Sequence, residues 1–138
     1  MSLRADLHLA LREFRQPAVW LGIWIFGWIL CVVLSLMHPP NIYLGFANGD
    51  KLEHFLAYGL LSAWSVLIFV EPRGRWSAAL LLMLLGIAME LAQGAWTSDR
   101  TMDAKDALAD AIGIGLGLCL ALTPANDFLL KLERRWLS

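Results

Sequence analysis

The chain has 138 residues, of which 59% are hydrophobic and 17% are charged, and its formal net charge is −1. Soluble domains carry about 45–50% apolar and about 25% charged residues, and a soluble fold of this length could not bury so much apolar surface. The composition therefore favours one integral membrane domain over residues 1–138. The lack of a basic excess argues against nucleic-acid binding.

Four apolar runs predict four transmembrane helices, so the chain is expected to be an all-α membrane protein built as a four-helix bundle. The runs cover residues 18–37, 54–70, 78–96 and 107–123. Each is close to the about 20 residues that cross about 30 Å of hydrocarbon. Turn-forming residues separate the runs, and the second and fourth runs are short and carry polar residues at one end.

The arginine and lysine residues predict how these helices are oriented. With four spans, the N-terminus, the second loop and the C-terminus share one side of the membrane, and most of the basic residues lie on that side. They are Arg4, Arg12, Arg15, Arg73, Arg75, Lys131, Arg134 and Arg135. Because cytoplasmic segments carry the excess of basic residues, both termini are expected in the cytoplasm.

Short amphipathic helices are expected at the two ends of the chain. Segments 3–14 and 128–137 place leucine and aromatic residues among charged residues at helical spacing. Such helices lie in the interface, with their basic residues toward anionic lipids. The two segments are therefore expected to anchor the bundle at the inner surface of the membrane.

Polar residues open the second span. At about 100° per residue, Asp50, His54 and Tyr58 fall on one face of a helix, with Lys51 beside them. This column of hydrogen-bonding groups can line a ligand site. It can also be an interfacial belt, because tyrosine is common at the level of the lipid headgroups. Both interpretations stay open from these residues taken by themselves.

The third span carries Glu90 and Gln93, which lie three residues apart on one helix face. About two turns of mostly apolar helix separate Glu90 from the end of the span, so its carboxylate cannot easily reach water. A charge at mid-membrane costs about 2.5–3.5 kcal/mol. Glu90 therefore needs an ion-pair partner, a polar cavity or a proton.

The fourth span begins with an acidic stripe. Asp103, Asp106 and Asp110 follow one another at spacings of three and four, and the same face continues as Gly113 and Gly117. Small residues let another helix approach closely, so the acids are expected to point into the bundle. Asp103 and Asp106 also suit the positive end of a helix dipole, but that role does not explain the deeper Asp110.

The polar residues of these three spans all lie toward the outward ends, which predicts one polar pocket that opens to the outside. His54, Glu90 and Asp103 are the candidate catalytic residues, because an imidazole oriented by a carboxylate can act as general acid or base. Asp106 and Asp110 are candidate ligands for a divalent cation, Mg²⁺ or Ca²⁺, which prefer oxygen. The candidate ligand-binding residues are Asp50, Lys51, Tyr58, Gln93 and Arg100.

Three motifs in chain order carry a resemblance to a known family. They are Asp-Lys-x-x-His-Phe-x-x-Tyr at 50–58, Glu-x-x-Gln at 90–93, and an arginine followed by spaced acids and glycine at 100–113. Their order resembles the VanZ-like family, over about residues 50–117. The chain departs from the family pattern at Asp110, where asparagine is expected more often, and at residues 98–99, where Pro-Gly is expected.

The resemblance implies a bacterial protein of the cytoplasmic membrane, whose family is associated through its founding member with resistance to the glycopeptide teicoplanin. Three functions fit the residues. The pocket can bind a lipid-linked or phosphate-bearing envelope ligand, such as a lipid-linked cell-wall precursor. It can be a metal-assisted enzyme acting on a lipid phosphate. It can instead be a structural or proton-relay network, for which four short spans would require an oligomer.

Overall fold

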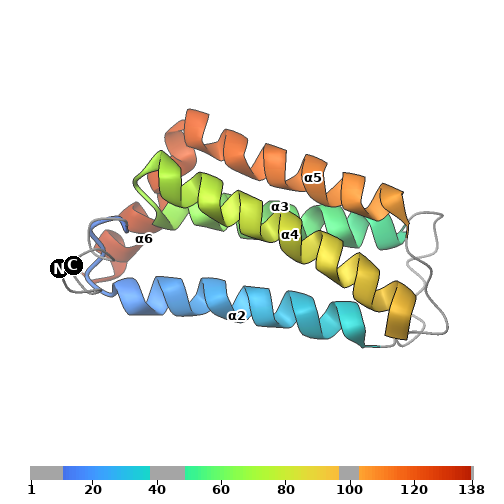
Figure 1. Cartoon of the computed structure of the whole chain (residues 1–138). Coiled ribbons are helices and arrows are strands. Elements are labelled where there is room, and N and C mark those ends of the chain that lie inside the picture. Colours follow the sequence, from blue (N-terminus) through green and yellow to red (C-terminus); the bar gives the residue numbers. More distant parts are fainter. Residues whose placement is uncertain (1–10, 38–48, 97–102, 138) are drawn as a thin grey trace.

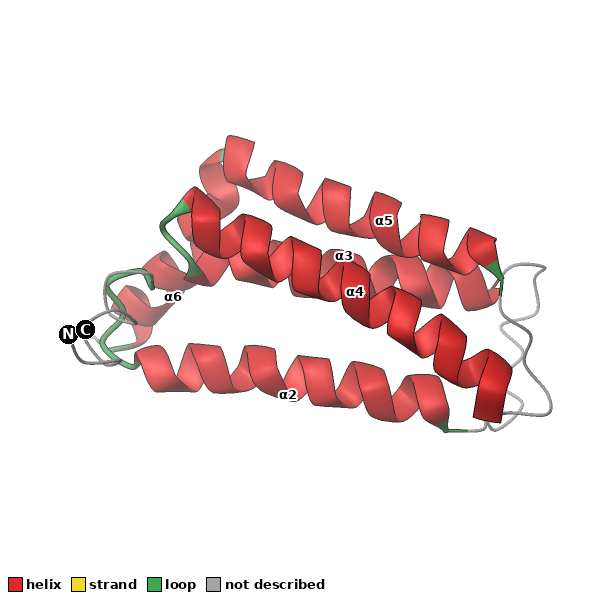
Figure 2. Cartoon of the chain, in the orientation of Figure 1, coloured by secondary structure: helices red, strands yellow, loops and turns green. Residues whose placement is uncertain are grey.

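The computed structural model describes residues 11–37, 49–96 and 103–137, except for the side chain of Asp50. Five α-helices lie in these ranges: α2 (Pro17–Leu36), α3 (Gly49–Ile68), α4 (Pro72–Trp96), α5 (Ala104–Cys119) and α6 (Phe128–Trp136). Figure 1 shows the four long helices side by side, with α6 across the end of the bundle where α2 begins. The predicted all-α class is confirmed for the described ranges, which also hold two short 3-10 turns and an isolated β-bridge (Figure 2).

Two of the helices, α2 and α4, are long and apolar enough to cross a membrane. A third span results if residues Ala104–Leu122 and Pro124–Trp136, which meet at an angle of 84°, are taken as one broken span. α3 is as long as α2, but charged residues in its first turns lower its hydropathy. The apolar helices thus indicate a membrane protein.

The surface of α2 is as apolar as its sequence. Of its twenty residues only Cys31 is buried, while Phe26, Ile29 and Leu34 are each more than half exposed. Soluble proteins rarely leave a contiguous apolar face of this size in water. A lipid environment satisfies such a face without any further partner.

The helices α3 and α5 pack most closely, through glycines on one face of α5. A Cβ atom added at Gly117 would lie 2.5 Å from the carbonyl oxygen of Gly59, so only glycine allows this approach of the two backbones. Ser62 Oγ donates a hydrogen bond to the carbonyl of Ile114 at 2.8 Å, also across the interface. The expectation that this face of α5 packs against a neighbouring helix is met.

The C-terminal amphipathic helix is present, and its Glu133 holds the beginning of α2. The Glu133 carboxylate accepts hydrogen bonds from the backbone N–H of Arg15 at 2.7 Å and of Gln16 at 3.0 Å, and from Trp20 Nε1 at 2.9 Å. Gln16, the N-cap of α2, makes no side-chain cap of its own. The buried Glu133 therefore supplies the acceptor that the first turn of α2 lacks.

The N-terminal amphipathic helix expected over residues 3–14 is not formed where the structure describes it. Residues 3–10 lie outside the described residues, and residues 11–14 are not helical. Leu11 instead forms a β-bridge with Phe69, and the backbone N–H of Arg12 donates to the carbonyl of Ile68 at 2.9 Å. Leu11 and Phe14 are both buried in this extended segment, against the end of α3 and α6.

Substituting Glu133 by alanine should lower the stability of the whole bundle. The substitution leaves three N–H donors without their acceptor, and each unpaired buried donor costs about 1–3 kcal/mol. We expect a fall in the melting temperature of the detergent-purified protein, measured by intrinsic tryptophan fluorescence. The matched variant Glu13→Ala removes an exposed glutamate nearby and should leave the melting temperature within error; equal effects of the two variants would contradict the role of Glu133.

The same carboxylate predicts the direction of a pH effect. Burial by itself would raise the pKa of Glu133, but the N–H groups of Arg15, Trp20 and Gln16 hold that pKa below its ordinary value. A group with a lowered folded-state pKa stabilises the fold above its ordinary pKa of about 4.3, and this contribution is lost as the pH falls through the folded-state value. The stability difference between wild type and Glu133→Gln should therefore shrink below about pH 4.

Candidate functional site

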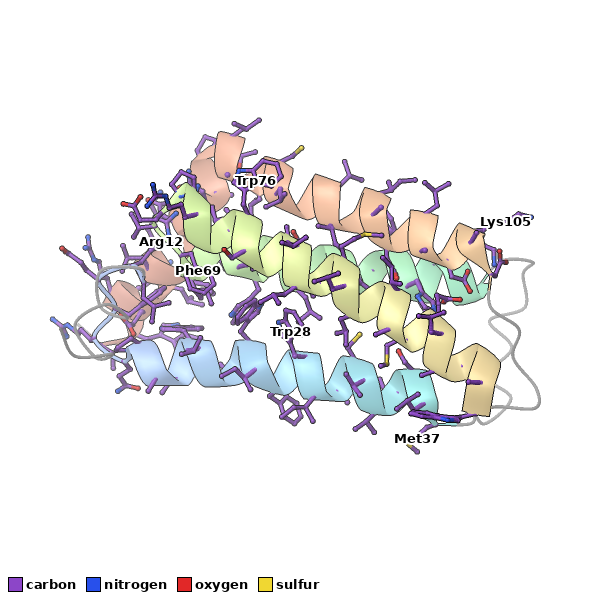
Figure 3. All side chains as sticks on the ribbon, in the orientation of Figure 1. Arg12, Trp28, Met37, Phe69, Trp76 and Lys105 are labelled. Atoms are coloured by element: carbon purple, nitrogen blue, oxygen red, sulfur yellow. The ribbon has the colours of Figure 1, made fainter. Side chains whose placement is uncertain are left out.

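Three helices bring polar side chains together at the end of the bundle opposite α6. α3 and α5 both begin at this end and α4 ends there, so the polar first turns of two helices meet the last turns of a third (Figure 1). In Figure 3, Lys105 at the start of α5 marks this end and Arg12 marks the opposite one. The described side chains of the cluster are Lys51, His54, Tyr58, Glu90, Asp103, Asp106 and Asp110.

His54 lies at the centre of the cluster, between carboxylates from two other helices. Its Nδ1 is 3.0 Å from Asp110 Oδ1, and its Nε2 is 4.0 Å from Glu90 Oε1. The ring stacks on Tyr58, with centroids 6.2 Å apart and planes inclined by 4°. Asp110 is fully buried and His54 is 9% exposed, so the carboxylates and the stacked ring fix the orientation of the imidazole away from bulk water.

Lys51 forms ion pairs with two carboxylates at the mouth of the cluster. Its Nζ lies 2.8 Å from Asp106 Oδ1 and 3.0 Å from Asp103 Oδ2. Asp103 also caps α5, because its Oδ1 accepts the backbone N–H of Lys105 at 2.9 Å. This hydrogen bond and the ammonium of Lys51 lower the pKa of Asp103, so that its carboxylate stays ionised.

Glu90 is linked to the start of α5 by its other oxygen. Glu90 Oε2 accepts the backbone N–H of Asp103 at 3.0 Å, while Glu90 Oε1 is buried and has no hydrogen-bond partner among the described residues. Asp110 Oδ2 is likewise buried and has no hydrogen-bond partner among the described residues. A Cβ atom at Gly86 would lie 2.5 Å from Asp110 Oδ2, so Gly86 provides the space that this carboxylate occupies.

Three residues of the cluster could hold a metal ion. His54, Glu90 and Asp106, all buried, each offer one ligand atom, and these atoms lie within 4.8 Å of one another. Of the two expected metal ligands, Asp106 belongs to this group. Asp110 lies behind it, on the far nitrogen of His54. Asp103, an expected catalytic residue, instead caps α5 and pairs with Lys51.

Of the five expected ligand-binding residues, two lie in the cluster, one connects α4 to α2, and the side chains of the other two are not described. Lys51 and Tyr58 lie in the cluster, and the buried Tyr58 hydroxyl lies close to the Cys31 thiol. Gln93 is buried, and its Nε2 donates to the carbonyl of Ser35 at 2.8 Å, which ties α4 to α2. Arg100 and the side chain of Asp50 lie outside the described residues.

A groove between α2 and α3 reaches His54 from the side of the bundle. Its volume is about 330 Å³. The wall toward α2 is formed by Cys31, Leu34 and Ser35, and the α3 side includes Glu53 and His54. The sequence did not predict that α2 lines this groove, because α2 carries no charged residue. The polar Ser35 near the end of α2 is a feature that could have indicated it.

The fixed imidazole can act as a general acid or base, or as a metal ligand, and the carboxylates can hold a cation. Comparison with known proteins adds nothing to this geometry: no protein-family model, curated protein or solved structure matches the chain.

Proposed function

We propose that this chain is a VanZ-like protein of the bacterial cytoplasmic membrane that crosses the bilayer four times, with both termini in the cytoplasm. The basic residues of the described ranges support this orientation. Of the nine basic residues in the described ranges, two, Lys51 and Lys105, lie at the end that holds the acidic cluster (Figure 3). The other seven belong to the segments at the end where α6 lies (Figure 1): Arg12, Arg15, Arg73, Arg75, Lys131, Arg134 and Arg135. By the positive-inside rule, the basic end is cytoplasmic and the cluster faces outward.

We further propose that the outward cluster binds the phosphate-bearing headgroup of an envelope lipid, such as a lipid-linked cell-wall precursor. The observation that carries this proposal is the meeting of charged side chains from three helices at one end of an otherwise apolar bundle. Burying such groups is costly, and ionisable residues at membrane depth usually mark a ligand or ion pathway. Lys51 lies at the mouth of the cluster, where a phosphate would bind its ammonium in place of one of its two carboxylate partners, Asp103 or Asp106.

The groove beside His54 supports a lipid rather than a water-soluble ligand. Leu34 and Leu56 give it apolar walls, and both are exposed on the surface that would face lipid. Its polar end is formed by Glu53 and His54. An acyl chain lying along Leu34 would place its headgroup beside the imidazole, so access from within the bilayer fits both the apolar and the polar residues.

The experiment is a comparison of lipids by native mass spectrometry of the detergent-purified protein. We expect an anionic phospholipid, phosphatidylglycerol, to be retained at least about tenfold better than diacylglycerol with the same acyl chains, a difference of about 1.4 kcal/mol. Excess inorganic phosphate should compete for the site. Equal retention of the two lipids would show that acyl chains alone are recognised and would overturn the proposal.

A second candidate is a metal-assisted enzyme acting on a lipid phosphate. It is favoured by one observation: His54 lies within reach of two carboxylates and is fixed by a third group, Tyr58. In such an enzyme the imidazole would transfer a proton while the cation stabilises the phosphate oxygens. Release of inorganic phosphate from a lipid phosphate, dependent on added divalent metal, distinguishes this function from binding.

The third function that the residues allow is a structural or proton-relay network. It requires no ligand, because the buried charges would pair with one another and fix the register of the helices. The proposed link to teicoplanin resistance rests on the family resemblance and would be compatible with any of the three.

A further inference from the structure

We propose that His54, Glu90 and Asp106 bind a single divalent transition-metal ion. The ligand atoms would be His54 Nε2 and one carboxylate oxygen from each of the two acids. The three residues come from three different helices, are each at most 9% exposed, and bring their ligand atoms within 4.8 Å of one another. This inference goes beyond lipid binding, because an ion held by these groups needs no headgroup to complete it.

The hydrogen bonding of His54 selects the nitrogen that faces the ion. Asp110 Oδ1 lies 3.0 Å from Nδ1. Because a carboxylate can only accept, we assign the N–H to Nδ1, and this tautomer leaves the lone pair of Nε2 toward Glu90. Metal-binding histidines almost always donate their other ring N–H to a carboxylate or carbonyl in this way. Asp110 is therefore a positioning residue for His54 and does not touch the ion.

The spacing suits an ion between the two groups. Bonds from a metal to an imidazole nitrogen and to a carboxylate oxygen are each about 2.0–2.2 Å long, so together they span up to about 4 Å. The observed separation of 4.0 Å between His54 Nε2 and Glu90 Oε1 is too long for a hydrogen bond but fits two such bonds. At 4.0 Å the two bonds would lie almost in line, whereas a tetrahedral site brings its ligand atoms to about 3.4 Å from one another. The side chains therefore have to close by several tenths of an ångström when the ion binds.

Glu90 provides the independent observation that a ligand is expected. Its Oε2 is held by the backbone N–H of Asp103, but its Oε1 is buried without a hydrogen-bond partner in the described part of the chain. Leaving a charged oxygen unpaired in this way is costly. Asp106 supplies the third ligand atom: Lys51 donates to its Oδ1, and one of its carboxylate oxygens lies within 4.8 Å of the ligand atoms of His54 and Glu90.

The composition of the group selects the class of metal. Mg²⁺ and Ca²⁺ prefer sites made of oxygen ligands, six to eight in the case of Ca²⁺. An imidazole with two carboxylates instead suits Zn²⁺ and other first-row ions, and three protein ligands leave a coordination position for water or a phosphate oxygen. The ion is thus expected to be Zn²⁺ or a neighbouring transition metal rather than the Mg²⁺ or Ca²⁺ expected from the acids alone.

The test is calorimetric titration of the full-length, detergent-purified protein after chelator treatment, with no lipid added. We expect one Zn²⁺ per chain, bound at least about 100-fold tighter than Mg²⁺, and Mn²⁺ between the two. Glu90→Gln, which keeps an oxygen for the Asp103 N–H, should weaken Zn²⁺ binding by at least about 100-fold. Asp127→Asn makes a comparable acid-to-amide change at the opposite end and should leave it unchanged.

Three results would overturn the proposal: no stoichiometric Zn²⁺ binding by the wild type, equal affinity for Zn²⁺ and Mg²⁺, or undiminished Zn²⁺ binding by Glu90→Gln. Because lipid is absent from the titration, each of these results would leave the proposed lipid function standing. Conversely, failure to retain phosphatidylglycerol would leave the metal site standing.

Asp110→Asn tests the positioning role separately. Loss of an outer-shell carboxylate typically weakens metal binding by about 10–100-fold, and we expect a loss in this range for Zn²⁺. The visible absorption spectrum of bound Co²⁺ should also shift. The melting temperature of the metal-free protein should not fall, because the variant removes a buried charge whose Oδ2 has no partner among described groups. A lower melting temperature with unchanged Zn²⁺ affinity would assign Asp110 a structural role instead.

Discussion

Replacing Gly117 by leucine is expected to prevent stable folding of the bundle. A Cβ atom at this position would lie 2.5 Å from the carbonyl oxygen of Gly59 and 2.7 Å from Ser62 Cβ. Two of the nearest groups belong to the backbone of α3, so they cannot move aside as a side chain can. Overpacking costs about 1–3 kcal/mol where side chains can adjust, and here we expect at least the upper end of that range.

The measurement is the yield of monodisperse protein by size-exclusion chromatography, together with its melting temperature. Gly115→Leu is the matched control, because Gly115 lies two residues away on α5 and a Cβ atom there meets nothing within 4 Å. We expect Gly115→Leu to behave as wild type and Gly117→Leu to aggregate or melt at a much lower temperature. If both variants are equally stable, the backbones of α3 and α5 are not in contact at Gly117.

His54→Gln is expected to weaken retention of phosphatidylglycerol at least about tenfold while leaving the protein folded. The imidazole sits where the groove meets the acidic cluster, so a headgroup that enters the cluster must contact it. Glutamine keeps polar atoms that can hydrogen-bond to Asp110, which avoids leaving that carboxylate without its partner. We expect at least a tenfold loss of retention, or about 1.4 kcal/mol, with little change in melting temperature.

The same variant distinguishes the proposed ligand-binding functions from a purely structural role of the cluster. If the cluster only fixes helix register, His54→Gln should lower the melting temperature while retention of phosphatidylglycerol, corrected for folded protein, stays the same. Asp127→Asn again serves as the control, since Asp127 pairs with Lys131 at the far end of the bundle. Native mass spectrometry and thermal unfolding of one preparation give both readouts.

The apolar runs of the sequence locate the helices well but place their beginnings too late. The second run begins at residue 54, whereas α3 begins at Gly49; the third begins at residue 78, whereas α4 begins at Pro72. Hydropathy marks the part of a helix that suits lipid, while backbone hydrogen bonding continues through polar turns. The extra turn of α3 matters for the site, because it holds Lys51 within reach of α5.

The segment 3–14 departs from the predicted helix in its described part, residues 11–14. Its helical spacing of leucines is real, but Leu11 and Phe14 bury themselves in an extended chain against α3 and α6. The spacing of hydrophobic residues indicates which residues will be buried. It does not record which neighbours will bury them, and here a tertiary contact overrides the local pattern.

The sequence predicts that the acidic stripe of α5 points into the bundle, because the stripe shares a helix face with Gly113 and Gly117. Both Asp106 and Asp110 are buried, as that face predicts. The individual partners could not be predicted in the same way, since they depend on the rotation and axial shift of each helix against the next. One helical turn separates Asp106, which pairs with Lys51, from Asp110, which pairs with His54.

Cysteine cross-linking tests most directly whether the three helices present these side chains to one another. In a background with Cys31 and Cys119 replaced by alanine, a short bifunctional methanethiosulfonate should link His54→Cys to Glu90→Cys. The matched pair, Leu56→Cys with Leu91→Cys, lies on the same two helices but on their exposed faces, and should not be linked. A link in the second pair and none in the first would mean that His54 and Glu90 do not face each other in the cluster. That result would contradict both the proposed lipid site and the proposed metal site.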